Sequence, residues 1–334
     1  MATIYDAFDT NYRIEYYGIT VNRDWKDNIA RWLYYSDSYH GGNNYRQGRY
    51  LTKYYMESAE EYDSRVKQTP LDNHCKSVVE TYNSFLFRTP PKREYGSIAN
   101  DPALDSFFQD ADYEGRTYDS FMRDVATQSS IYGVVWVMVD KGTANVGTRA
   151  EELQQGLRPY VAMFTPENVI DWAYTRQPSG AYELTFVRIW EGSDDDYGYY
   201  RELTPELISV YRKARGSMQE DQAELLEEYK NNIGKVPCVP VYAQRSRIKG
   251  VGISDIADIA DMQRAVYNEL SELEQIVRIS NHPSLVKTSD TQAAAGAGAI
   301  IDLPNDLEPA LKPYLLEPSG SGIGNILSSL ENKA

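Results

Sequence analysis

One stretch constrains the fold more than any other: a helical pattern from Ser254 to Asn281, between Gly252 and Pro283. At 1.5 Å per residue this helix is about 42 Å long, much longer than the average helix of a globular protein. Ser254 is a good N-cap residue, and Asp255 lies favourably at the positive end of the helix. The sequence therefore predicts one unbroken helix that is too long for a small core.

Apolar and acidic side chains separate on a helical wheel of about 100° per residue. The apolar residues cover roughly a third of the circle, and the carboxylates lie on a separate arc roughly 130° away. Three interpretations remain open: an ordinary helix with a solvated face, a coiled coil, or a helix in a ring whose acidic face lines a channel. The apolar arc contains Ile256, Ile259, Val266, Leu270, Leu273 and Val277. The acidic arc contains Asp258, Asp261, Glu269 and Glu272, our candidates for a channel or intersubunit face.

The rest of the chain predicts an α+β fold. Residues 20–90 have helical spacing, with Trp25, Ile29 and Trp32 on one face, and Ser58 with Glu61 forms a capping box. "RTPPKREYG" then ends the helices, because proline cannot continue them.

A β-rich zone follows. "VVWVMVD", "YVAMF", "NVIDWAYT" and "AYELTFVRIWEG" are rich in β-branched and aromatic residues, and short turns join them. Two more strands flank "LTPE", so we expect an antiparallel meander. We expect the acidic stretch Gly216–Lys235 to be partly helical. A short strand in "VPCVPVY" precedes the long helix, "SLVKTSD" forms a strand after it, and "GIGNILSSLENKA" begins another helix.

Composition limits the function. The chain has 49 Asp and Glu against 34 Lys and Arg, and its net charge of −15 argues against a protein that coats phosphates. Such a chain can still enclose nucleic acid without gripping it. The 28 tyrosines suit either an interface or internal packing. Cys75 and Cys238 are expected to be reduced and buried. With no signal-peptide pattern and no apolar run long enough to cross a membrane, we expect a soluble intracellular product.

No pattern of catalytic residues rises above background. The chain contains no phosphate-binding loop, no nucleophile motif and no spaced His or Cys ligands, so we predict no catalytic residue, metal or cofactor. The carboxylates Asp194, Asp195 and Asp196 lie in "EGSDDDYG", which we interpret as a solvated hairpin tip rather than a cation site.

The order of these features resembles the portal proteins of tailed bacteriophages. "YLTKYYMESAEEYDSRVKQTPLDNHCKSVVETYNSFLFRTPP" is similar to the N-terminal helical segment of that family. "FTPENVIDW" and "LTFVRIWEG" resemble strand pairs of its wing region. "GISDIADIADMQRAVYNELSELEQIVRISNHPSLVKTSD" resembles its G-x-S-x-[IL] turn and stem helix, and "GAGAIIDLPNDLEPALKPYLLEPSGSGIGNILSSLE" its clip region returning to a second stem helix.

The resemblance implies a portal-like fold with a wing over residues 1–249 and a first stem helix over 250–281. It further implies a small α/β clip over 282–318 and the start of a second stem helix over 319–334. Family members continue through a tunnel loop and a crown, so we expect this chain to lack the C-terminal part. In the clip, Lys287 and Lys312 are our candidates for partner contacts.

The implied function is a ring of twelve copies at the capsid vertex of the virion, without enzymatic activity. Its partners would be the major capsid protein, terminase, a head–tail adaptor and double-stranded DNA, which passes through the ring without sequence specificity. Two alternatives stay open. One is another structural protein of the virion, such as a head–tail adaptor or scaffold-binding protein. The other is a hydrolase with a dispersed carboxylate site at Asp194, Asp195 or Asp196.

Overall fold

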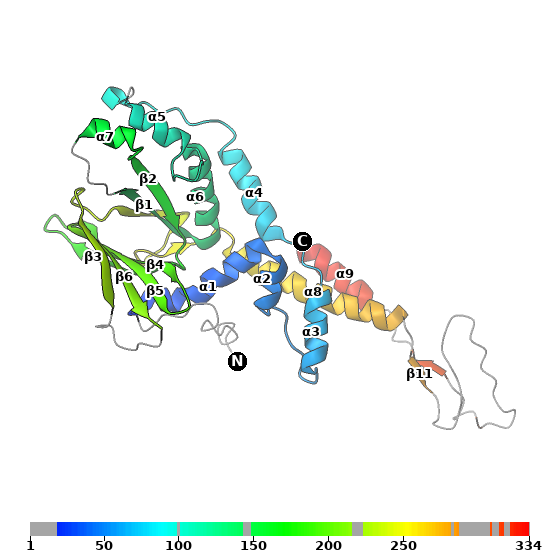
Figure 1. Ribbon diagram of the computed structural model, residues 1–334. Coiled ribbons are helices and arrows are strands. Elements are labelled where there is room, and N and C mark those ends of the chain that lie inside the picture. The colour runs from blue at the N-terminus through cyan, green and yellow to red at the C-terminus, as the bar shows by residue number, and fades with distance from the viewer. Residues whose placement is uncertain are drawn as a thin grey trace. The chain divides into compact units, whose positions relative to one another are not determined.

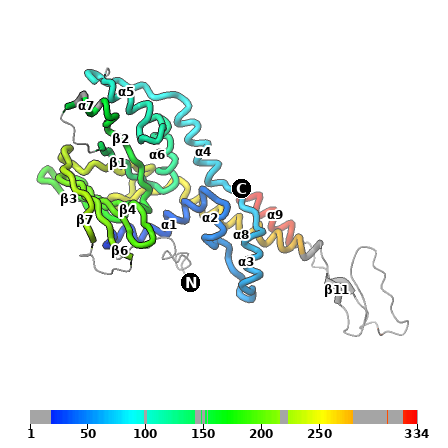
Figure 2. Tube along the Cα trace, in the orientation of Figure 1, coloured from blue at the N-terminus to red at the C-terminus, as the bar shows by residue number. Residues whose placement is uncertain are grey.

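The computed structural model describes residues 19–98, 101–142, 148–215, 223–281, 284–286, 308, 314–316 and 321–333 (Figure 1). The contacts of the chain divide it into two compact units. Figure 2 traces the backbone of both units. Unit 1 comprises Met1–Asn44 and Asn73–Ala260, and unit 2 comprises Tyr45–Asp72 and Asp261–Ala334. Two helices, α2 (Gly42–Gln47) and the long α8 (Ala257–Asn281), begin in unit 1 and continue in unit 2.

The first helix of unit 1 forms as its tryptophan spacing predicts. α1 (Arg23–His40) begins where the Asn22 side chain accepts a hydrogen bond from the backbone N–H of Asp24, at 2.8 Å. Trp25 and Trp32 are completely buried, and the Trp25 indole donates to the carbonyl oxygen of Pro166 at 2.8 Å. The apolar face of α1 is therefore fixed to the β-rich part of unit 1.

A central helix, α6 (Tyr118–Tyr132), organises the other helices of unit 1. It contacts α1, α4, α5 and the strands β1 and β8. Thr117 caps its first turn, and Gly133 ends it in a left-handed conformation. The remaining helical segments are α4 (His74–Leu86), α5 (Pro102–Gln109), α7 (Arg149–Gln154) and a short 3-10 turn at Gly96–Ile98.

Two antiparallel sheets replace the single meander expected from the sequence. In the first, β1 (Val134–Lys141) lies between β2 (Pro159–Phe164) and β8 (Cys238–Tyr242). β8 comes from the stretch that precedes the long helix, and as an edge strand it accommodates Pro240. One face of this sheet packs against α6 through a core of Ala111, Phe121, Val125, Val135 and Val161.

The second sheet is an antiparallel meander, with its five strands in chain order. They are β3 (Val169–Arg176), β4 (Tyr182–Ser193), β5 (Tyr197–Leu203), β6 (Leu207–Ala214) and β7 (Glu224–Lys230). A two-residue ladder joins β9 (Gln244–Arg245) to β10 (Gly252–Ile253) just before α8.

The expectation of helix within Gly216–Lys235 is wrong for its described part. β7 is a strand that pairs with β6 from Arg212–Glu224 to Leu207–Lys230. Most of its side chains are exposed, because it is an edge strand of the sheet. Its glutamates discourage pairing with further strands, which is a common property of sheet edges. Local acidity therefore indicated exposure here rather than helix.

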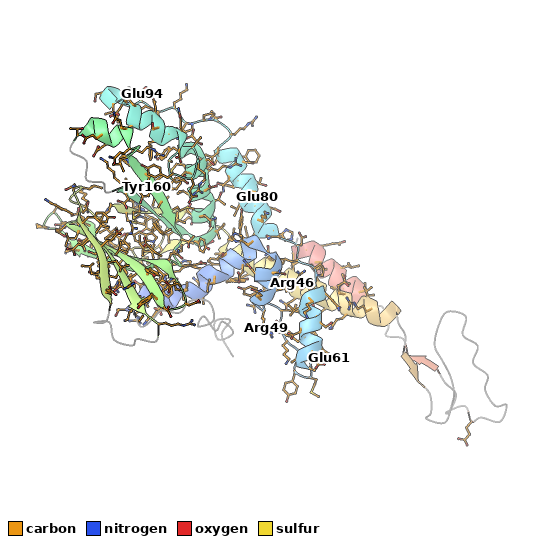
Figure 3. All side chains as sticks on the ribbon, viewed as in Figure 1. Arg46, Arg49, Glu61, Glu80, Glu94 and Tyr160 are labelled. Carbon is orange, nitrogen blue, oxygen red and sulfur yellow. The ribbon has the colours of Figure 1, made fainter. Side chains whose placement is uncertain are left out.

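A buried carboxylate joins the two sheets of unit 1. Asp140 at the end of β1 accepts hydrogen bonds from Arg201 at 3.0 Å, from Tyr160 at 3.1 Å and from Tyr229 at 3.3 Å. Tyr160 lies on the neighbouring strand β2 (Figure 3), whereas Arg201 and Tyr229 come from β5 and β7. Because Asp140 is almost fully buried, these three donors compensate for its lost hydration.

Unit 2 is built around the greater part of α8. The capping box that the sequence predicts at α3 (Ala59–Gln68) is confirmed, since Ser58 and Glu61 hydrogen-bond to each other's backbone N–H groups. Figure 3 labels Glu61 in the first turn of α3. Beyond α8, the expected strand β11 (Ser284–Val286) pairs with β12 (Tyr314–Leu316), and the expected last helix is α9 (Ser321–Lys333).

Candidate functional site: the long helix

The acidic face of α8 is only partly open to solvent. The side chains of Asp258, Asp261 and Glu272 are exposed, as the wheel predicts. Glu269 is half-buried and accepts hydrogen bonds from Ser329, at 3.0 Å, and from Lys333 of α9. One member of the predicted stripe thus holds α9 against α8, and three face solvent in the single chain. Their place in a channel or between subunits stays a prediction.

The apolar arc of α8 becomes less buried along the helix. Ile256 and Val266 are buried, and so is Ala260, whose carbonyl oxygen accepts from the Tyr34 hydroxyl at 2.6 Å. Val277, near the other end, is 37 % exposed. The helix is therefore firmly packed at its head, and its apolar side has more room for a partner toward its tail. Ile259, Leu270 and Leu273 are intermediate in exposure.

Two glycines set the point from which α8 departs. Gly133 ends α6 with a φ of +84°, and a Cβ atom there would lie 2.6 Å from the Ile253 carbonyl carbon and 2.7 Å from the Ser254 nitrogen. On the other side, a Cβ atom on Gly252 would overlap the carbonyl oxygen of Gly133. The two backbones approach this closely only because neither residue has a side chain.

The Ser254 hydroxyl fastens the head of α8 to the end of α6. It donates toward the carbonyl oxygens of Ile131, at 2.6 Å, and Ser130, at 3.1 Å, and accepts from the backbone N–H of Ile256 at 3.2 Å. Asp255 adds a backbone hydrogen bond to Ser130 at 3.0 Å. Because Ser254 lies in this junction, the helix begins at Ala257 rather than directly after Ser254. These contacts give a physical reason for the glycine and the serine of the Gly-x-Ser-x-Ile pattern.

A buried ion pair holds the middle of α8 inside unit 2. The Arg65 guanidinium of α3 hydrogen-bonds both oxygens of Glu57, at 2.7 and 2.8 Å, and the Ser271 hydroxyl of α8 at 3.1 Å. It also donates to the Thr52 carbonyl oxygen at 2.6 Å and lies over the ring of Tyr54. The two charged side chains are only 4 % and 6 % exposed. The hydrogen bond from Arg65 holds the pKa of Glu57 below its ordinary value, so the carboxylate remains ionised at neutral pH.

A second set of contacts ties residues 45–52 to the same helix. The Tyr50 carbonyl oxygen accepts from Arg264 at 3.0 Å and from Asn268 at 3.3 Å, and the Asn268 amide oxygen accepts from the Thr52 N–H at 2.8 Å. The rings of Tyr45 and Tyr267 meet edge to face, with their centroids 5.2 Å apart. The segment before α3 therefore packs on α8 through both polar and aromatic groups.

Arg65 was not among the residues predicted from the sequence, although the sequence carries a signal for it. The buried residues of α3 include Tyr62, Arg65 and Val66, which places a charged residue on the apolar face of a short helix. A charge in such a position requires a buried partner. Glu57 lies in the loop before the helix, and its pairing with Arg65 depends on how that loop folds.

The candidate residues of the predicted clip, Lys287 and Lys312, lie outside the described residues. The described strands β11 and β12 pair in antiparallel register from Ser284–Leu316 to Val286–Tyr314. Residues near the two ends of the predicted clip, over 282–318, are thus brought together by this pairing.

The described residues contain little that suggests catalysis. Asp194 accepts hydrogen bonds from the backbone N–H groups of Asp196 and Tyr197 and from the Tyr199 hydroxyl. This carboxylate therefore organises a hairpin tip, as we predicted. Cys75 and Cys238 are both buried thiols, as expected. In the part of the chain that the structure describes, no group of three His, Cys, Asp or Glu is placed to hold a metal ion. Within the same part, no helix combines the length and apolarity needed to cross a membrane.

Comparison with known proteins identifies a family. The family model for "Phage portal protein, SPP1 Gp6-like" matches residues 19–302, well over half of the chain. The matched span includes the two-glycine junction, α3 with its buried arginine, and the whole of α8. A search of curated proteins finds no match.

Replacing Gly133 by alanine tests the junction at the head of α8. Gly115 is a matched control, because its φ of +83° is nearly the same but open space surrounds it. Both substitutions incur the strain of a left-handed alanine, about 1–2 kcal/mol. We expect Gly133→Ala to lower the free energy of unfolding by about 4 kcal/mol or more, since the backbones must also separate. Urea unfolding at one protein concentration measures the free energy of unfolding of both variants. An equal loss of stability in Gly133→Ala and Gly115→Ala would contradict a tight backbone crossing.

Replacing Arg65 by methionine tests the buried ion pair. The change leaves the Glu57 carboxylate buried without its partner, and we expect it to cost about 3–5 kcal/mol of stability. The control is Arg49→Met, which removes an ion pair with Asp63 whose side chains are 63 % and 51 % exposed. An exposed pair contributes at most about 1 kcal/mol. Thermal unfolding of the two variants in parallel compares their stability. A similar loss of stability in both would show that Arg65 does not organise unit 2.

Proposed function

We propose, from the premise that this chain belongs to the phage portal protein family of the SPP1 Gp6-like type, that its copies surround a channel through which the genome is packaged and ejected. Membership makes the chain a structural component of a phage virion, and the family implies an oligomeric ring associated with the capsid. The match over residues 19–302 is the observation that carries the proposal. The number of subunits, twelve, follows from the resemblance alone.

The exposed carboxylates of α8 suit the wall of such a channel. Asp258, Asp261 and Glu272 lie on one arc of a 25-residue helix and face solvent in the single chain. DNA that must slide needs a surface without strong attraction for phosphates, and carboxylates repel them. The chain's overall charge of −15 is consistent with a conduit and not with a protein that grips DNA. We therefore assign these three residues to the channel side, with Glu269 as a link to α9.

The other regions take their roles from the same family membership. We assign residues 1–249 to the wing, 250–281 to the first stem helix and 319–334 to the start of a second. Residues 282–318 would form a clip that meets terminase during packaging and a head–tail adaptor afterwards. Lys287 and Lys312 are proposed to make contacts there. The wing would face the major capsid protein, and assembly would take place in the host cytoplasm.

Measurement of the assembled mass tests the ring. Native mass spectrometry of the purified chain should give one large homo-oligomer, and electron microscopy should show a closed ring with a central hole wide enough for duplex DNA. A strictly monomeric protein under assembly conditions would refute the proposal. A compact oligomer without a hole of that width would instead favour the alternative of another virion protein, such as a head–tail adaptor.

Charge reversal on α8 tests the channel side. In the triple variant Asp258→Lys, Asp261→Lys, Glu272→Lys, we expect rings to retain short duplex DNA at low salt at least tenfold more tightly. Retention should then weaken steeply with added salt, because released counterions drive phosphate binding. Glu274→Lys is the control, since this exposed residue lies roughly 180° around the helix from the acidic arc. If rings of the triple variant and of the wild type retained DNA equally, the acidic arc would not face the channel.

A further inference from the structure

Helix α4 presents an apolar stripe that is exposed in the part of the chain that the structure describes. Its buried residues Cys75, Val79 and Asn83 face the rest of unit 1, and the Asn83 amide donates to Thr127 of α6 at 2.8 Å. A neighbouring arc of the same helix is apolar but exposed. It consists of Val78, Tyr82, Phe85 and Leu86, which are 44 %, 73 %, 69 % and 61 % exposed. We call these four residues, together with Arg88 and Lys92, the α4 patch.

Two exposed cations follow directly after the stripe. Arg88 and Lys92 lie in the "RTPPKR" segment that ends α4, and both are exposed. The next cation, Arg93, is already paired with Asp119. On a chain with a net charge of −15, this cluster is opposite in sign to most of the surface. Aromatic side chains beside arginine are a composition typical of protein–protein interfaces.

The edge strand β7 of the second sheet also exposes apolar residues, and acidic residues lie beside them. Leu225 and Leu226 of β7 and Ile233 just after it are 47 %, 40 % and 60 % exposed. A register shift between β6 and β7 leaves Leu226 as an extra residue, because Tyr211 opposes Leu225 and Val210 opposes Glu227. Such a bulge bends the edge strand and re-aims its side chains.

Two glutamates come next along the edge strand. Glu227 and Glu228 follow the bulge on β7, and both side chains are exposed. We call these two glutamates, together with Leu225, Leu226 and Ile233, the β7 patch. The α4 patch is apolar and basic, whereas the β7 patch is apolar and acidic.

The two patches lie far apart within unit 1. Figure 2 shows α4 and β7 on opposite flanks of this unit, with α6 and the first sheet between them. One copy of the chain therefore cannot bring its own patches together. A ring of identical copies needs two different surfaces on each copy, because every contact in it runs head to tail.

We propose that the α4 patch of one copy packs against the β7 patch of the next copy, forming the repeated contact between unit 1 of neighbouring subunits. The inference rests on the proposed ring and names the surfaces that close it. The apolar residues would form the dry centre of the contact. Glu227 and Glu228 point to opposite faces of the edge strand, so Arg88 and Lys92 would meet them on the two sides of that centre. Because each copy offers one patch of each kind, a closed ring leaves neither uncovered.

Cysteine cross-linking gives a direct test. The two native thiols provide little background, since both are buried and burial raises the pKa of Cys75 to about 12. In the double variant Leu86→Cys, Leu226→Cys, a short bis-maleimide should link neighbouring copies into a ladder that ends at the full ring. Each single variant should give no ladder. The control Ser84→Cys, Leu226→Cys moves the first thiol to the polar side of α4 and should cross-link at least tenfold less.

The outcomes separate the inference from the proposed function. Rings seen by electron microscopy without a ladder, or with an equal ladder from the Ser84 control, would overturn the α4–β7 contact and leave the portal assignment intact. Wild-type protein that never forms rings would overturn the portal assignment itself.

A charge exchange provides a second measurement that needs no cross-linker. Arg88→Glu with Lys92→Glu, or Glu227→Lys with Glu228→Lys, should raise the concentration at which rings form at least tenfold. All four substitutions together should restore assembly to within a few fold of wild type. Additive loss in the fourfold variant would contradict the pairing.

Discussion

The close approach of Gly133 and Gly252 is the constraint on which the path of the long helix depends. Two backbones cross there at a distance that no Cβ atom permits. The crossing brings Ser254 under the last carbonyl groups of α6, where its hydroxyl bonds Ile131. Since α6 also packs against α1, α4, α5 and β1, the residues just before α8 are fixed to the central helix of unit 1. A single Gly-x-Ser-x-Ile pattern thus connects the sheet-bearing part of the chain to its longest helix.

A different kind of interaction holds the later turns of α8. The Arg65–Glu57 pair is buried, so it contributes only while every donor and acceptor around it is satisfied. Thr52, Ser271 and the ring of Tyr54 complete that set. The head of α8 is therefore held by backbone fit, and its middle by charge and hydrogen bonds.

Local patterns predicted the elements well where one physical preference dominates. The tryptophan spacing of α1, the Ser58–Glu61 capping box and the β-branched runs of β1 to β4 each formed as expected. The prediction failed at β7, where acidic side chains suggested a helix although the strand gains its hydrogen bonds from β6. The two-sheet arrangement was missed for a similar reason, because β8 pairs with β1 about 100 residues earlier in the chain. On α8 the wheel located the exposed Asp258, Asp261 and Glu272, but it could not show that Glu269 binds Lys333.

By itself the sequence determined the α+β class, the length and two-faced character of the long helix, and the absence of a recognisable catalytic motif. Those properties follow from periodicity, capping and composition, which act over a few neighbouring residues. Only the tertiary structure decided that Gly133 meets Gly252, that Arg65 finds Glu57 and Ser271, and that α4 and β7 leave apolar surface uncovered. Such contacts depend on which segments, far apart in the sequence, lie next to each other in the fold, and local conformational preferences do not determine this.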